Sequence, residues 1–137
     1  MSTTLHKTLN RNVADLITLG PEVEDFLARH AVSSKTVGKV RVVLEEIMIN
    51  LINHSTGSAT GLIDVRLDVE PARVVVLIED DGTPFDPRSA PEFDRSLPLE
   101  QRRAGGMGIQ LVRSLVEELD YKCLSGRNRL RLVIAQP

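Results

Sequence analysis

The feature that most constrains the fold is the stretch over residues 40–55, VRVVLEEIMINLINHS. Apolar residues recur there at i, i+3, i+4, i+7, i+8 and i+11, which is one stripe of an amphipathic helix packed on a core. The stripe consists of Val40, Val43, Leu44, Ile47, Met48 and Leu51. Glu46 and Asn50 fall on another face, only about 40° apart, so a carboxylate and a carboxamide project side by side. Such a pair can hold a metal or take a proton, but for a lone ExxxN a solvated polar edge is the commoner explanation.

Length and composition predict one globular domain over residues 1–137, because 42% hydrophobic and 26% charged residues are ordinary for such a domain. A net charge of −2 and 3% aromatic residues argue against nucleic acid as a partner. Cys123 is the single cysteine, which fits a reducing compartment. The polar N-terminal residues and the lack of a long apolar run predict no membrane partner and a cytoplasmic location.

The N-terminal part is predicted as an edge strand followed by a helix. Residues 3–10 form the strand, and residues 13–30 keep a helical period. Pro21 interrupts that period and predicts a break or a first-turn proline. Ser33 and Ser34 then offer N-caps for the long helix.

Two strands and a long loop are predicted after that helix. Residues 63–70 alternate apolar and charged side chains, as in a half-buried strand. Residues 74–78 are a continuous apolar run that ends on the acidic turn 79–82. Residues 83–104 show neither a helical nor a strand period, and this long segment is predicted to be a mobile functional loop. Its arginines are Arg88, Arg95, Arg102 and Arg103.

The C-terminal part is predicted as a helix and two strands. Gly105 and Gly106 open the helix, whose apolar period extends to Leu119. The strands cover about 121–124 and 129–134, and the hairpin turn is assigned to Gly126 with Arg127 and Asn128. This order of elements predicts an α/β (α+β) two-layer sandwich, with a mixed, mostly antiparallel sheet and helices on one face.

Three segments carry candidate chemistry, and each is a weak signal when taken alone. They are the Glu46 and Asn50 face, the Asp80-Asp81-Gly82 turn and the glycines at 105, 106 and 108. Asp-Gly is a common turn dipeptide. The glycines lack the preceding strand that a dinucleotide-binding fingerprint needs, although exposed N–H groups at a helix start do bind phosphate.

The order and spacing of these segments resemble the GHKL ATPase superfamily, which has the Bergerat ATP-binding fold. EEIMINLINH resembles its N box, IEDDGTPFDP its first glycine box and GGMGIQLVRSLVEEL its second. The compact form resembles the anti-sigma-factor serine kinases of the RsbW and SpoIIAB type. The likeness extends over roughly residues 40–134.

The resemblance implies a role for each matched residue. It implies that Glu46 is the general base, that Asn50 binds Mg²⁺ through its amide oxygen and that Asp80 accepts the adenine amino group. It further implies that Gly82 lets the backbone approach the base. The glycines that would let the lid and the helix start close on the phosphates are Gly105, Gly106 and Gly108. Family members often carry Thr or Ser beside that aspartate in the last strand pair, whereas here none follows Ser125.

The implied function is that of an ATP- and Mg²⁺-dependent protein serine kinase in a partner switch that regulates transcription. Its substrate would be a serine of a STAS-domain anti-anti-sigma protein, and its client a sigma factor or similar regulator. Such kinases are often homodimers, and the half-buried strands are compatible with one. The missing hydroxyl residue motivates an alternative, a nucleotide-responsive partner-binding module with little or no kinase activity.

Overall fold

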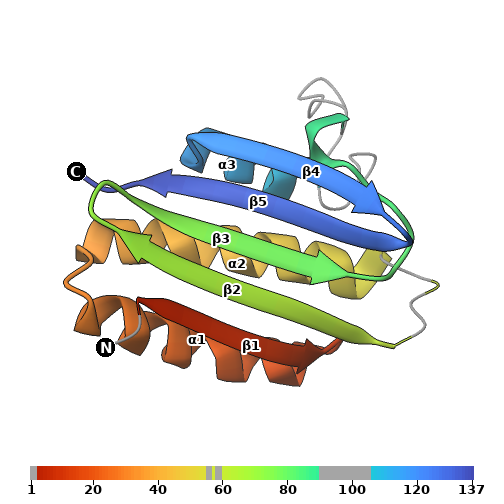
Figure 1. Ribbon diagram of the computed structural model, residues 1–137, viewed down its shortest axis with the longest axis horizontal. Coiled ribbons are helices and arrows are strands. Elements are labelled where there is room, and N and C mark those ends of the chain that lie inside the picture. The colour runs from red at the N-terminus through yellow and green to blue at the C-terminus, as the bar shows by residue number, and fades with distance from the viewer. Residues whose placement is uncertain (1–2, 55–56, 58–59, 90–105) are drawn as a thin grey trace.

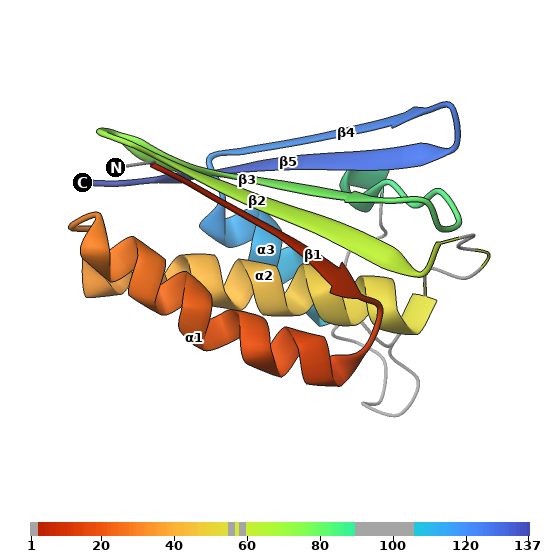
Figure 2. The same cartoon turned by 60° about the horizontal axis from the view of Figure 1, so that its bottom comes forward.

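The computed structural model describes residues 3–54, 57, 60–89 and 106–137. A five-stranded sheet forms one layer, and three helices form the other (Figures 1 and 2). The strand order is β1-β2-β3-β5-β4, and all four pairings are antiparallel, which confirms the predicted fold class. The elements in chain order are β1 (Thr4–Asn10), α1 (Val13–Arg29), α2 (Ser34–His54), β2 (Leu62–Glu70), β3 (Arg73–Asp80), η1 (Pro87–Ser89), α3 (Gly106–Leu115), β4 (Glu118–Leu124) and β5 (Arg127–Ala135).

The apolar stripe of α2 forms the centre of the core, as predicted. Its side chains are 0–3% exposed at Val40, Val43, Leu44, Ile47 and Met48. They belong to one cluster with the inward residues of the sheet. The helix begins at Ser34, earlier than the stripe, and the N–H of Thr36 donates to Ser33 Oγ at 3.3 Å, which confirms Ser33 as a cap.

The predicted break at Pro21 is wrong, because α1 continues through it. Proline has no N–H, so the carbonyl of Ile17, one turn earlier, loses its helical partner. Pro21 is exposed and the Ile17 side chain is 69% exposed, so this side of the helix faces solvent. Water can therefore serve that carbonyl, and the helix tolerates the proline.

The predicted extension of the last helix to Leu119 is also wrong, because α3 ends at Leu115. The N–H of Glu117 donates to the carbonyl of Val133 at 2.7 Å, which turns the chain into β4. Leu119 pairs with Leu132 of β5. Its apolar side chain therefore belongs to the inward row of a strand, and the helical period there was coincidental.

The β4–β5 turn begins one residue before the predicted one and ends two residues before it, at Ser125 and Gly126. Ser125 and Gly126 have φ values of 53° and 77°, the conformation that a two-residue type I′ hairpin turn needs at both positions. Arg127 pairs with Leu124, so Arg127 and Asn128 belong to β5. This shift matters for the site, because Asn128 becomes a strand residue with a defined face.

The uncovered face of the sheet carries charged side chains, and Asp64 of β2 lies at their centre. Asp64 Oδ1 accepts a hydrogen bond from Thr8 Oγ1 at 2.6 Å, and Oδ2 pairs with the Arg127 guanidinium. His6 Nε2 lies 3.7 Å from Oδ1. The Thr8 hydrogen bond and Arg127 lower the pKa of Asp64, while partial burial opposes them.

We expect Asp64 to stabilise the fold in a pH-dependent way. A lowered folded-state pKa contributes stability above the unfolded value of 3.8, and this contribution is lost as the pH falls through the folded-state pKa. Asp64→Asn should lower the urea-unfolding free energy at pH 7 by about 1 kcal/mol. The difference from the wild type should shrink at pH 3 and below.

Asp120→Asn is the matched control for this prediction. Its carboxylate is 58% exposed and lies 3.9 Å from Arg131, so its removal should change stability little at either pH. An Asp64→Asn deficit that stays constant from pH 7 to pH 2.5 would contradict the expected pH dependence.

Candidate functional site

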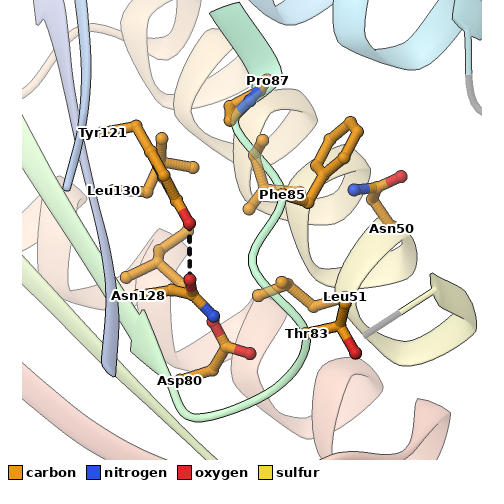
Figure 3. Close-up of a pocket in the computed structure, with 11 residues that line it drawn as sticks. Asn50, Leu51, Asp80, Thr83, Phe85, Pro87, Tyr121, Asn128 and Leu130 are labelled. Atoms are coloured by element: carbon orange, nitrogen blue, oxygen red, sulfur yellow. Dashed lines mark hydrogen bonds between the residues drawn. The ribbon is translucent and has the colours of Figure 1, made fainter. Parts of the chain in front are cut away.

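An open pocket lies between α2, the ends of β3 and β5, and the segment that follows β3 (Figure 3). It is a narrow cleft that is partly open to solvent, with a cavity volume of about 40 Å³. Apolar side chains predominate in its wall, with few polar groups among them. The lining residues are Ile47, Asn50, Leu51, Ile78, Asp80, Thr83, Phe85, Pro87, Tyr121, Asn128 and Leu130.

Asp80 lines one end of this pocket, and Gly82 is bonded to it. Asp80 is the last residue of β3 and is 5% exposed. Its Oδ2 accepts a hydrogen bond from the Gly82 N–H at 3.0 Å, and Gly82 is itself buried. An ionised carboxylate accepts only, so this end of the pocket is suited to a ligand N–H group.

Asn128 is a site residue that the sequence reasoning missed. It pairs with Asp80 across β3 and β5 and is 6% exposed. Its Nδ2 donates to the Gly82 carbonyl at 2.9 Å, and its Oδ1 accepts from the Tyr121 hydroxyl at 2.6 Å (Figure 3). A detectable signal existed, since Asn128 is the one polar member of an inward row whose other members are Leu130, Leu132 and Ile134.

Glu46 and Asn50 project from α2 at two neighbouring places. Asn50 is half-buried and lines the pocket near Phe85 (Figure 3). Glu46, one turn earlier, lies against the first turn of α3: a Cβ added to Gly108 would collide with its carboxylate and lie 3.1 Å from its Cδ. The absence of a side chain at Gly108 thus leaves room for the Glu46 carboxylate, which lies beside the positive end of a helix.

Side-chain contacts hold residues 83–89, which are the described part of the predicted mobile loop. Asp86 and Arg88 form a forked ion pair, with an Nη2–Oδ2 distance of 2.9 Å, and Arg88 lowers the pKa of Asp86. Arg88 Nη2 also donates to the Tyr121 carbonyl at 3.3 Å, and Arg113 of α3 donates to the Pro87 carbonyl at 2.5 Å. We call residues 82–89 the strap.

Several predicted residues fall outside this geometry. Gly105 and three of the loop arginines, Arg95, Arg102 and Arg103, lie outside the described residues. Gly106 is the first residue of α3. Of the described helices, none combines the length and apolar character that crossing a membrane requires.

Comparison with known proteins agrees with this geometry. A family model described as "Histidine kinase-like ATPase domain" matches residues 9–134. The serine-protein kinase RsbW of Bacillus thuringiensis is 23% identical over 84 residues, which are 58% of this chain and 52% of the relative. RsbW of Oceanobacillus iheyensis is 23% identical over 96 residues, covering 66% and 61%. The first two curated relatives, one of them a sensor histidine kinase-like protein of Rickettsia conorii, are matched over 13% and 52% of their own lengths.

A solved structure has the same fold. The crystal structure of the RsbU and RsbW domains of a Mycobacterium tuberculosis protein superposes with a TM-score of 0.68 at 18% identity. The match covers 98% of this chain and 32% of that one. The chain therefore belongs to the histidine kinase-like ATPase domain family. Within that family, its resemblance to the RsbW-type kinases is confirmed.

The contact between α2 and α3 gives a prediction that involves no ligand. Gly108→Ala should cost about 1 kcal/mol relative to the gain that alanine normally brings inside a helix, because the new methyl displaces the Glu46 carboxylate. In a Glu46→Ala background most of that cost should vanish, since the obstructing group is gone. Chemical denaturation of the four proteins of this double-mutant cycle measures the coupling.

Gly38→Ala is the control for this cycle. Gly38 lies inside α2 with nothing within 4 Å of an added Cβ, so alanine should stabilise the protein by about 0.5–1 kcal/mol. Equal costs of Gly108→Ala in both backgrounds would show that the two groups do not touch.

Proposed function

We propose that residues 1–137 act as one ATP- and Mg²⁺-dependent protein serine kinase domain and partner switch. It would phosphorylate a serine of a STAS-domain antagonist and hold a sigma factor or similar client inactive. The observation that supports this most is that a buried carboxylate, Asp80, and a half-buried carboxamide, Asn50, line the same pocket. A base-binding end and a metal-binding end are thus available in one cleft.

In this proposal Asp80 accepts a hydrogen bond from the 6-amino group of adenine, and the apolar wall covers the ring. The amide oxygen of Asn50 is a hard donor that fits Mg²⁺, which needs few protein ligands when phosphates and water supply the rest. A bound Mg²⁺ neutralises phosphate charge during transfer. Gly105, Gly106 and Gly108 let the start of α3 come close to the phosphates, where N–H groups stabilise negative charge.

Glu46 is the proposed general base. It takes the proton of the substrate serine while the serine oxygen forms its bond to the γ-phosphorus and ADP leaves. Its carboxylate lies beside Gly108, at the start of the helix that the phosphates are proposed to approach. The proposed base and the start of the proposed phosphate-binding helix are therefore neighbours.

The relatives support the substrate class. The name of the two RsbW relatives, serine-protein kinase, agrees with a protein serine as the phosphate acceptor. The anti-anti-sigma substrate, the sigma-type client and the homodimer are carried over from the family resemblance, and the cytoplasmic location from the sequence. They are parts of the proposal that binding and phosphorylation assays with candidate partners can test.

The first test is nucleotide binding. Calorimetric titration of the protein with ATP should show micromolar to millimolar affinity that strengthens when Mg²⁺ is added. Asp80→Asn should weaken ATP binding by at least about tenfold, since a charged acceptor in a buried site is worth roughly 1.5–3 kcal/mol. Absence of binding at millimolar ATP would refute the proposed pocket.

The second test separates a kinase from a binding module. Glu46→Gln should bind ATP like the wild type but lose phosphotransfer to the antagonist by about 10²–10⁴-fold. The mass of the antagonist after incubation with Mg·ATP measures the transfer as the gain of one phosphate. If the wild type binds ATP and changes partner affinity without any such gain, the alternative of a nucleotide-responsive binding module is the correct function.

A further inference from the structure

The buried amide of Asn128 has a fixed orientation. The Gly82 carbonyl can only accept a hydrogen bond, so the Asn128 nitrogen must face it, at 2.9 Å. The Asn128 oxygen then faces the Tyr121 hydroxyl at 2.6 Å, and the hydroxyl must be the donor. Burial raises the pKa of Tyr121, which keeps that proton in place.

This orientation bears directly on Asp80. Asn128 donates to the carbonyl of Gly82, and the N–H of Gly82 donates to Asp80 Oδ2 at 3.0 Å. Asn128 and Asp80 are also direct partners across β3 and β5, and both are nearly inaccessible to solvent. The neutral amide thus lies beside a carboxylate without competing for its charge, and Asp80 can stay an acceptor.

We propose that Asn128 and Tyr121 are positioning residues that make the site selective for 6-aminopurines over 6-oxopurines. This inference rests on the proposed nucleotide pocket. An ionised Asp80 pairs with an amino group at purine position 6 and repels a carbonyl oxygen there. The selectivity therefore depends on the Asp80 carboxylate being held in place. Tyr121 fixes the Asn128 amide, and Asn128 fixes the Gly82 turn on which Asp80 depends.

Tyr121 also reaches the other side of the pocket. Its backbone carbonyl accepts from Arg88 of the strap at 3.3 Å, while its side chain lines the cavity. In Figure 3 the hydroxyl points toward Asn128 and the ring lies along the wall. Tyr121 of β4 therefore contacts both Asn128 and Arg88. Asn128 holds Gly82, the first residue of the strap, and Arg88 lies near the end of the strap.

The decisive variant is Asn128→Leu, which keeps the approximate size of the side chain and removes both hydrogen bonds of the amide. The Gly82 carbonyl then loses its donor, and the turn whose N–H bonds to Asp80 is no longer held. A carboxylate that is no longer held in place discriminates less between a 6-amino and a 6-oxo group, so the selectivity should fall. Binding of ADP and IDP, which carry 6-amino and 6-oxo purines, measures this without any phosphotransfer.

We expect the wild type to bind ADP at least about 100-fold more tightly than IDP, as a site with a buried polar reader does. Asn128→Leu should lower that ratio at least about tenfold. Tyr121→Phe, which removes only the hydroxyl, should weaken ADP binding about tenfold and IDP binding less. Asn53→Leu is the matched control, because it makes the same change at an exposed position outside the pocket and should leave the ratio unchanged.

The outcomes separate this inference from the proposed function. If the wild type binds ADP selectively and both Asn128→Leu and Tyr121→Phe keep that ratio, Asn128 and Tyr121 do not set selectivity, although the pocket stands. If the wild type binds neither nucleotide, both proposals fail. Should Asn128→Leu not fold, Tyr121→Phe alone decides, because a purely structural hydroxyl would leave the ratio unchanged.

Discussion

The burial of one helix face organises the whole site. The stripe on α2 is 0–3% exposed from Val40 to Met48, and fully burying each such side chain contributes about 1.5–3 kcal/mol. Rotating α2 about its axis would expose several of them, so its orientation on the sheet is fixed. Glu46 and Asn50 are then directed toward the edge of that contact, where α3 and the end of β3 lie. Apolar packing therefore determines where the polar groups meet.

The sheet contributes the other half of the site through its register. Asp80 and Asn128 are opposite each other because the inward apolar residues of β3 and β5 are paired, with Ile78 against Leu130 and Val76 against Leu132. A slip of one residue would turn these side chains to solvent, so the core enforces the register. The buried Asp80 carboxylate and the buried Asn128 amide lie at one end of that inward row. They are adjacent to each other as a consequence of hydrophobic pairing further along the strands.

Local patterns predicted most of the fold, and the errors fall where distant contacts decide. Sequence patterns predicted the α2 stripe, the alternation in β2 and the Asp-Gly turn, because each is a signal between residues close together in the chain. The end of α3 is not, since the Glu117 N–H bonds to Val133 of another strand. Asn128 was placed in a turn because Ser125 at φ 53° carries no compositional sign of that conformation. The anchoring of residues 83–89 depends on Arg113 of α3, which sequence order does not link to them.

These contacts also connect the two ends of the site. Helix α3 touches Glu46 through Gly108 and holds the strap through Arg113 and the Pro87 carbonyl. The strap in turn is tied to β4 by Arg88, and β4 holds Asn128 through the Tyr121 hydroxyl. A displacement of α3 therefore acts on the carboxylate at one end and on the strap at the other. The glycines proposed to approach phosphate lie at the start of α3. A ligand that moved α3 would therefore act on both the Glu46 carboxylate and the strap.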